Sequence, residues 1–249
     1  MDSAINPYQS PEPAPPVEEI TAGEHASSFQ SARPWGIAAC LGIGANLLVA
    51  MAAMWISIAL LLLYNVDDVA EIDPEMEQSL LFWLNMSFVA MIAVRLLTAI
   101  PFMVWMYKVY LNLLALGHAS VDWKPWLAPI CWLIPVFNLF APCLIMREIL
   151  WKSDPQAEVL GKNHPALQMV NIWWAAWIGA MFMSWIGNRL DFAAQSLPDF
   201  VFATRWDVGT SVVLIVCGVL AIWLIIDIDG RQLRRSARQL PDGIQFVQS

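Results

Sequence analysis

The sequence has little charge. Only 14% of its 249 residues are Asp, Glu, Lys or Arg, whereas 59% are hydrophobic. Soluble domains are about a quarter charged and close to half apolar, so this balance favours a membrane protein. The net charge is −8, and no stretch combines basic with aromatic residues in the manner of a nucleic-acid surface. We therefore expect no nucleic-acid partner.

The sequence also lacks the motifs of common enzymes. It has no G-x-S-x-G elbow, no H-E-x-x-H motif and no Walker A loop. Its four cysteines lie singly in apolar runs without a C-x-x-C pair, which argues against a zinc site and a disulfide framework. The three histidines fall in the tail and in loops, away from any candidate nucleophile in an apolar segment. We expect no enzymatic activity, no metal and no cofactor.

Residues 1–33 contain too few apolar residues to fold alone. They hold five prolines before Val17, several serines and five acids. This composition predicts a disordered, acidic, proline-rich tail, and it does not match a signal peptide. Residues 34–240 form the predicted helical membrane domain, and 241–249 form a short C-terminal tail.

Four apolar runs in this domain are long enough to cross a bilayer, which takes about 20 residues. They cover about 35–64, 79–107, 166–186 and 208–226. Pro101 predicts a kink in the second run, since proline removes one helical hydrogen bond. The sequence therefore predicts an all-α integral membrane protein.

A fifth apolar stretch, residues 125–151, allows two interpretations. Pro135 lies in its middle and disfavours helical angles at the residue before it. Asn138 is a natural N-cap for a new helix beginning at Leu139, with Pro142 in that helix's first turn. The stretch is either one kinked span, giving five transmembrane helices, or a re-entrant helical hairpin broken at Pro135.

The distribution of basic residues favours the hairpin, because lysine and arginine near membrane ends stay cytoplasmic. With a hairpin, ten lie inside and only Arg189 and Arg205 lie outside. With a crossing span, the split becomes five to seven or seven to five. We therefore predict four transmembrane helices plus the hairpin, with both termini cytoplasmic. The ten inner residues are Arg33, Lys108, Lys124, Arg147, Lys152, Lys162, Arg231, Arg234, Arg235 and Arg238.

Two segments carry a family resemblance. The first is WMYKVYLNLLALG, and the second is IPVFNLFAPCLIMREILW. They resemble the shared block of a bacterial multi-pass membrane protein family known as domain of unknown function 4328, over about residues 75–240. The resemblance implies a bacterial cytoplasmic membrane and no particular activity, and Cys143 departs from the aromatic residue often found there. The positions that match are Trp105, Asn112, Gly117, Pro135, Asn138, Pro142, Arg147, Glu148 and Trp151.

Arg95 is the main candidate for a binding residue. It lies about 16 residues into the second span, and an intramembrane charge costs a few kcal/mol unless it has a partner. It could bond to carbonyls freed near Ile134–Val136, snorkel to the interface, or hold an anion or lipid phosphate. The turn at Pro135 and Asn138 could add a helix N-terminus to an anion site, or Asn138 could simply cap its own helix.

Arginines near the C-terminus suit anionic lipid headgroups. These are Arg231, Arg234, Arg235 and Arg238, and Asp227 has the i, i+4 spacing of a salt bridge with Arg231. The sequence favours a non-enzymatic scaffold or regulator of other membrane components, with the N-terminal tail as a tether to a membrane-protein partner. The alternative is a small transporter or channel subunit with its site at the hairpin break near Arg95.

Overall fold

A computed structural model describes residues 29–65, 72–118, 120–156 and 166–239. Almost all of the predicted N-terminal tail and the whole of the predicted 241–249 tail lie outside these residues.

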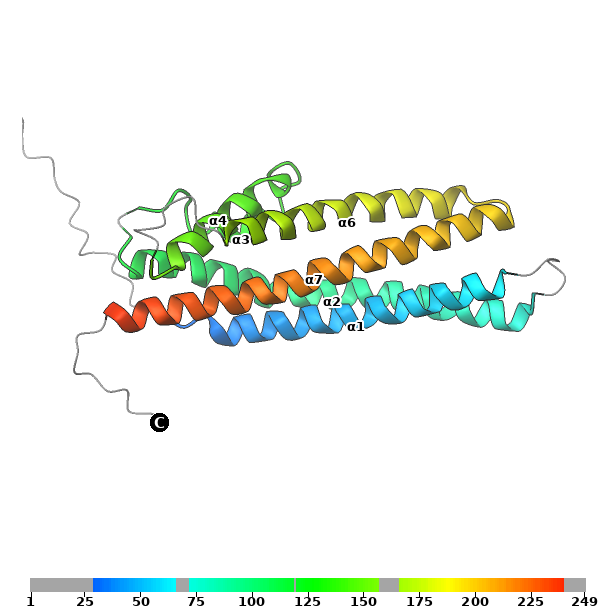
Figure 1. Ribbon diagram of the computed structural model, residues 1–249, viewed down its shortest axis with the longest axis horizontal. Helices are drawn as coiled ribbons and strands as arrows, with labels where there is room; N and C mark the ends of the chain where they lie inside the picture. Colours follow the sequence, from blue (N-terminus) through cyan, green and yellow to red (C-terminus); the bar gives the residue numbers. More distant parts are fainter. Residues whose placement is uncertain (1–28, 66–71, 119, 157–165, 240–249) are drawn as a thin grey trace, which may run out of the picture.

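Four long helices run alongside one another and make up most of the molecule (Figure 1). They are α1 (Arg33–Leu63), α2 (Pro74–Ala115), α6 (Leu167–Ala193) and α7 (Leu197–Gln239). Their 31, 42, 27 and 43 residues exceed the roughly 20 that a hydrocarbon core requires. All four are long and apolar enough to cross a membrane, which confirms the predicted fold class.

The helix ends differ from the predicted spans because acids that hydropathy excludes act as caps. Asp73 accepts hydrogen bonds from the N–H groups of Glu75 (3.0 Å) and Met76 (3.4 Å), so α2 begins at Pro74 instead of near Ser79. At the start of α7, the Asp199 carboxylate accepts from the Ser196 N–H at 3.1 Å. The predicted 208–226 run is therefore only the middle of a longer helix, because helical hydrogen bonding does not require an apolar surface at the ends.

Residues 125–153 form a hairpin and not a fifth long helix. It consists of α3 (Leu127–Ile130), a turn, the 3-10 helix η2 (Phe137–Leu139) and α4 (Ala141–Ser153). The segment starts and finishes at the end of the bundle where α2 and α7 terminate (Figure 1). At about 1.5 Å per residue, the 13 residues of α4 span about 20 Å, too short to cross a bilayer. The break at Pro135 lies where the sequence predicted it.

The hairpin closes one end of the bundle. Helix α2 packs on α1, α1 on α7 and α7 on α6, and the hairpin fills the space between α2 and α6 at its own end. Beyond the hairpin tip, α2 and α6, both described along their whole lengths, scarcely touch each other. The outward faces carry exposed apolar side chains such as Leu41 (71%) and Trp55 (72%), as expected where helices meet lipid.

Candidate functional site

A cavity of about 500 Å³ lies among the four long helices, just past the hairpin tip. Its wall is mainly apolar, and every long helix contributes to it together with Trp132 of the hairpin. Its size falls within the roughly 300–1,000 Å³ of small-molecule sites. It lies beside the gap that remains where α2 and α6 do not pack against each other, so we take it as the candidate binding site.

Arg95 lines this cavity from the middle of α2 and is exposed. Within the described residues it makes no hydrogen bond or salt bridge. The predicted bond to carbonyls at the hairpin break is therefore wrong. Ile134 O accepts the Asn138 N–H at 2.8 Å and Val136 O accepts the Leu139 N–H at 3.2 Å, so the turn satisfies these carbonyls itself.

Other polar groups of the cavity wall also lack partners in the described structure. Trp173 is only 3% exposed, and its indole N–H has no acceptor. Asn46 donates to Gly42 O at 3.1 Å and to Thr98 Oγ1 at 3.3 Å, but its buried amide oxygen is unpaired. An unpaired buried polar group costs about 1–3 kcal/mol, so these groups are suited to a ligand that pairs with them.

Trp132 fixes the hairpin tip against α2 and α6. Its ring centroid lies 5.4 Å from that of Phe102 and 5.6 Å from that of Trp177, both in edge-to-face geometry. Its indole N–H donates to Met106 Sδ at 3.1 Å, and Trp174 of α6 donates to Leu139 O at 3.2 Å. Aromatic packing therefore closes the cavity on the hairpin side.

Asn138 does not cap a helix, which corrects the sequence prediction. It lies within η2, and its side-chain oxygen is buried without a partner in the described structure. Helix α4 begins two residues later than predicted, at Ala141, with Phe140 as its N-cap and no side-chain cap. Pro142 then falls at the second helical position, where its missing N–H removes no helical bond.

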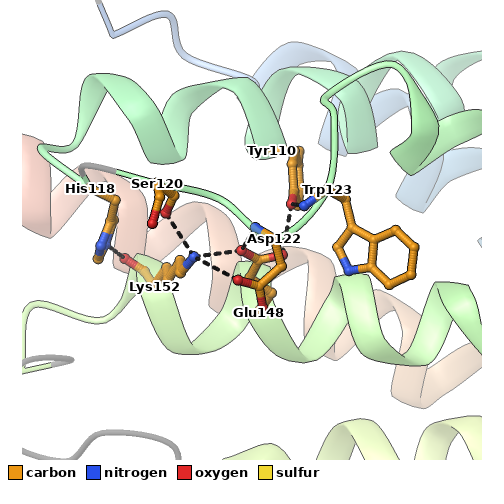
Figure 2. A network of polar contacts seen from close by, with 7 residues as sticks. All are labelled: Tyr110, His118, Ser120, Asp122, Trp123, Glu148 and Lys152. Carbon is orange, nitrogen blue, oxygen red and sulfur yellow. Dashed lines mark hydrogen bonds and ion pairs between the residues drawn. The ribbon is translucent and has the colours of Figure 1, made fainter. Parts of the chain in front are cut away.

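Glu148 is the centre of a buried polar network at the hairpin end (Figure 2). Its carboxylate accepts from the Tyr110 hydroxyl at 2.7 Å and from the Asp122 N–H at 2.7 Å. The Lys152 ammonium lies 2.5 Å from the same carboxylate, with each side chain at most 6% exposed. This network bonds α4 to α2 and to the loop between them.

Lys152 extends the network along that loop. Its ammonium also donates to Ser120 O at 2.9 Å, while its backbone carbonyl lies 2.8 Å from a His118 ring nitrogen (Figure 2). The Tyr110 hydroxyl accepts in turn from the Trp123 N–H at 2.8 Å. Because these polar atoms form hydrogen bonds and ion pairs with one another, we interpret the network as structural.

Two resemblance positions on α2 anchor α7. The Trp105 indole N–H donates to Asp229 Oδ1 at 2.9 Å. The Asn112 amide donates to Gln232 Oε1 at 3.0 Å and to Gln30 O at 2.8 Å, and Gln232 donates back to Val109 O at 2.8 Å. Sequence analysis singled out Trp105 and Asn112 but no partner, because the partners lie more than 75 residues away.

Three further resemblance positions, Gly117, Arg147 and Trp151, lie in the loop after α2 or on α4. Gly117 follows α2 with φ 82°, a left-handed conformation that favours glycine, and so turns the chain into the loop. Arg147 donates to Asn171 Oδ1 at 2.6 Å and joins α4 to α6. The Trp151 ring lies 5.7 Å from the Lys152 ammonium. None of these positions lines the cavity.

Two of the four C-terminal arginines are used inside the protein. Arg231 forms the predicted salt bridge with Asp227 at 2.8 Å and also pairs with Asp154. Arg235 is buried and donates to Asp154 O at 2.8 Å. Arg234 and Arg238 of this group are exposed, whereas Arg231 is half-buried and Arg235 is buried. Contact of the four arginines with anionic headgroups stays a prediction.

The sequence missed Tyr110, Lys152, Asp154 and Gln232 as members of these networks. One signal was present, since Glu148 and Lys152 have the i, i+4 spacing of a helical ion pair.

Four helices able to cross a membrane, closed at one end by a bonded hairpin, define the class as an α-helical membrane protein. A family model described as Domain of unknown function (DUF4328) matches residues 68–230. The match covers more than half of the chain, so the chain belongs to this family, as the resemblance implied. No curated protein and no solved structure matches the chain.

Proposed function

We propose that this chain is a non-enzymatic membrane protein that binds an anionic molecule in the cavity beside Arg95. The observation that carries the proposal is an exposed, unpaired guanidinium, among the described residues, within a cavity of about 500 Å³. An intramembrane arginine costs a few kcal/mol and normally faces a partner or water. An anion beside Arg95 supplies that partner.

The polar chemistry elsewhere supports binding instead of catalysis. Tyr110, Glu148 and Lys152 are buried titratable side chains bonded to one another, and their bonds hold α4 to α2. Arg95, in contrast, stands in space that a ligand can enter. The geometry therefore supports the alternative function, a small transporter or channel subunit with its site near Arg95. A transporter must bind its substrate before moving it, and the cavity supplies a place for that step.

A scaffold or regulator remains a prediction from the sequence. Its tether would be the N-terminal tail, of which residues 1–28 lie outside the described part of the chain.

We further propose a bacterial cytoplasmic membrane with the hairpin end facing the cytoplasm. The basic residues support this orientation: Arg33, Lys108 and Arg238 lie at the hairpin end with α4, while Arg189 and Arg205 lie near the α6–α7 turn. The hairpin then enters and leaves from the cytoplasmic side.

Native mass spectrometry of the full chain released from lipid nanodiscs tests the binding proposal. We expect the wild type to retain an anionic molecule and Arg95→Gln to lose it by about 10-fold to 100-fold, because a hydrogen bond to a charged group contributes about 1.5–3 kcal/mol. Arg205→Gln, which neutralises an exposed arginine outside the cavity, is the matched control and should retain it. Equal retention by Arg95→Gln, or no anion on the wild type, would overturn the proposal.

A further inference from the structure

The cavity is unclosed on its side, between α2 and α6. These helices scarcely touch beyond the hairpin tip, although both contribute to the cavity wall. Their outward faces carry large exposed apolar side chains, among them Leu96 (67%) on α2 and Phe182 (54%) on α6. In a bilayer this side opening faces acyl chains and not water.

The hairpin end is closed to a water-borne ligand. Trp132 and the rings around it cover the cavity there. Behind them, Trp105 bonds to Asp229, and Asn112 bonds to Gln232. A molecule reaching Arg95 from that end would have to separate these contacts, whereas one coming from the lipid would not.

The wall suits an amphiphile better than a small soluble anion. Arg95 and the Trp173 N–H provide one cation and one hydrogen-bond donor, and most of the remaining lining is apolar. An apolar wall complements a ligand that carries apolar segments beside its charge, and an inorganic ion has no apolar surface to place against it. Chain segments next to an anionic head would contact this wall.

We infer that the ligand is an anionic membrane phospholipid, which enters sideways between α2 and α6 and places its phosphate beside Arg95. This inference rests on the proposed function. The cavity holds the headgroup region, and the acyl chains extend through the side opening into the bilayer. The phosphate accepts hydrogen bonds from the guanidinium, and arginine suits this role because its planar fork can donate two parallel bonds.

The test measures phosphatidylglycerol, phosphatidylcholine and inorganic phosphate binding to the delipidated full chain in neutral detergent, by native mass spectrometry. We expect phosphatidylglycerol to bind at least 10-fold more tightly than phosphatidylcholine and Arg95→Gln to remove the preference. Ala99→Trp, which fills the cavity from α2, should weaken phosphatidylglycerol binding at least 10-fold. Ala93→Trp, on the exposed face of the same helix and outside the lining, should leave it unchanged.

The outcomes separate this inference from the proposed function. Arg95-dependent binding of inorganic phosphate without phosphatidylglycerol preference overturns the lipid inference and leaves the proposed function standing. Binding of neither anion overturns both. Phosphatidylglycerol binding that survives both Arg95→Gln and Ala99→Trp would place the lipid on the outer surface and contradict the inference. A protein that co-purifies with the chain instead of a lipid would also contradict it. If Ala99→Trp does not fold, Met181→Trp fills the same cavity from α6 with a smaller change in volume.

Discussion

Lys152→Met tests whether the buried network holds the hairpin to the bundle. The change keeps the apolar stem but removes the ammonium that lies 2.5 Å from Glu148. The carboxylate, with 4% of its side chain exposed, keeps its bonds from Tyr110 and the Asp122 N–H, both 2.7 Å long. Ser120 O loses a donor at 2.9 Å. The variant therefore leaves a buried, partly satisfied negative charge.

The expected cost follows from that buried charge. Removing one partner of a buried ion pair costs about 3–5 kcal/mol. Since two hydrogen bonds to Glu148 survive, we expect the lower end, about 3 kcal/mol. The double variant Lys152→Met with Glu148→Gln removes both charges, and its amide can accept from Asp122 N–H and donate to the Tyr110 hydroxyl. It should recover about 2 kcal/mol of that loss.

The assay is the free energy of unfolding in mixed micelles of dodecyl maltoside and sodium dodecyl sulfate, followed by near-ultraviolet circular dichroism. Arg147→Met is the matched control, because it removes a half-buried cation from the same helix, and that cation bonds to the neutral side chain of Asn171. It should cost only about 1 kcal/mol. If Lys152→Met costs no more than the control, or the double variant is as unstable as the single one, the argument from charge burial is wrong.

Three further predictions follow. Gly117→Ala should lower the free energy of unfolding by about 1–2 kcal/mol, because the φ of Gly117 is 82°. Gly44→Ala is the control: an added Cβ meets open space within a helix, so this change should raise the free energy of unfolding by about 0.5–1 kcal/mol. Equal effects of the two changes would contradict the role of Gly117 in the turn. Burial and then the 2.8 Å bond to Glu77 raise the pKa of Tyr64 to about 12, so the contact should stabilise the fold fully below about pH 10 and be lost as pH rises through about 12. The absorbance difference between wild type and Tyr64→Phe at 295 nm should show this midpoint, and a midpoint near pH 10 would refute it. Compartment reporters inserted within residues 157–165 and after residue 249 should both report the cytoplasm, and either one on the far face would exclude the proposed orientation.

The presence of the four long helices could be predicted from the sequence, because a membrane-length helix depends on the composition of one continuous segment. The long apolar runs predicted α1, α2, α6 and α7, and Pro135 predicted the break in the hairpin. The ends could not be placed from hydropathy, because Asp73 and Asp199 stabilise helix starts through hydrogen bonds that an apolar count penalises. The error at Asn138 has a similar source, since a cap depends on backbone angles that the residue type alone does not determine.

By itself, the amino-acid sequence determined that the chain has four membrane-length helices and an interrupted fifth segment, because hydrophobic length and proline geometry act locally. Only the tertiary structure decided that Trp105 bonds to Asp229, that Glu148 and Lys152 are buried, and that Arg95 lines a cavity in place of meeting the hairpin turn. Those outcomes depend on which faces of distant helices meet. Hydrogen bonds across 100 or more residues leave no periodic trace in one sequence.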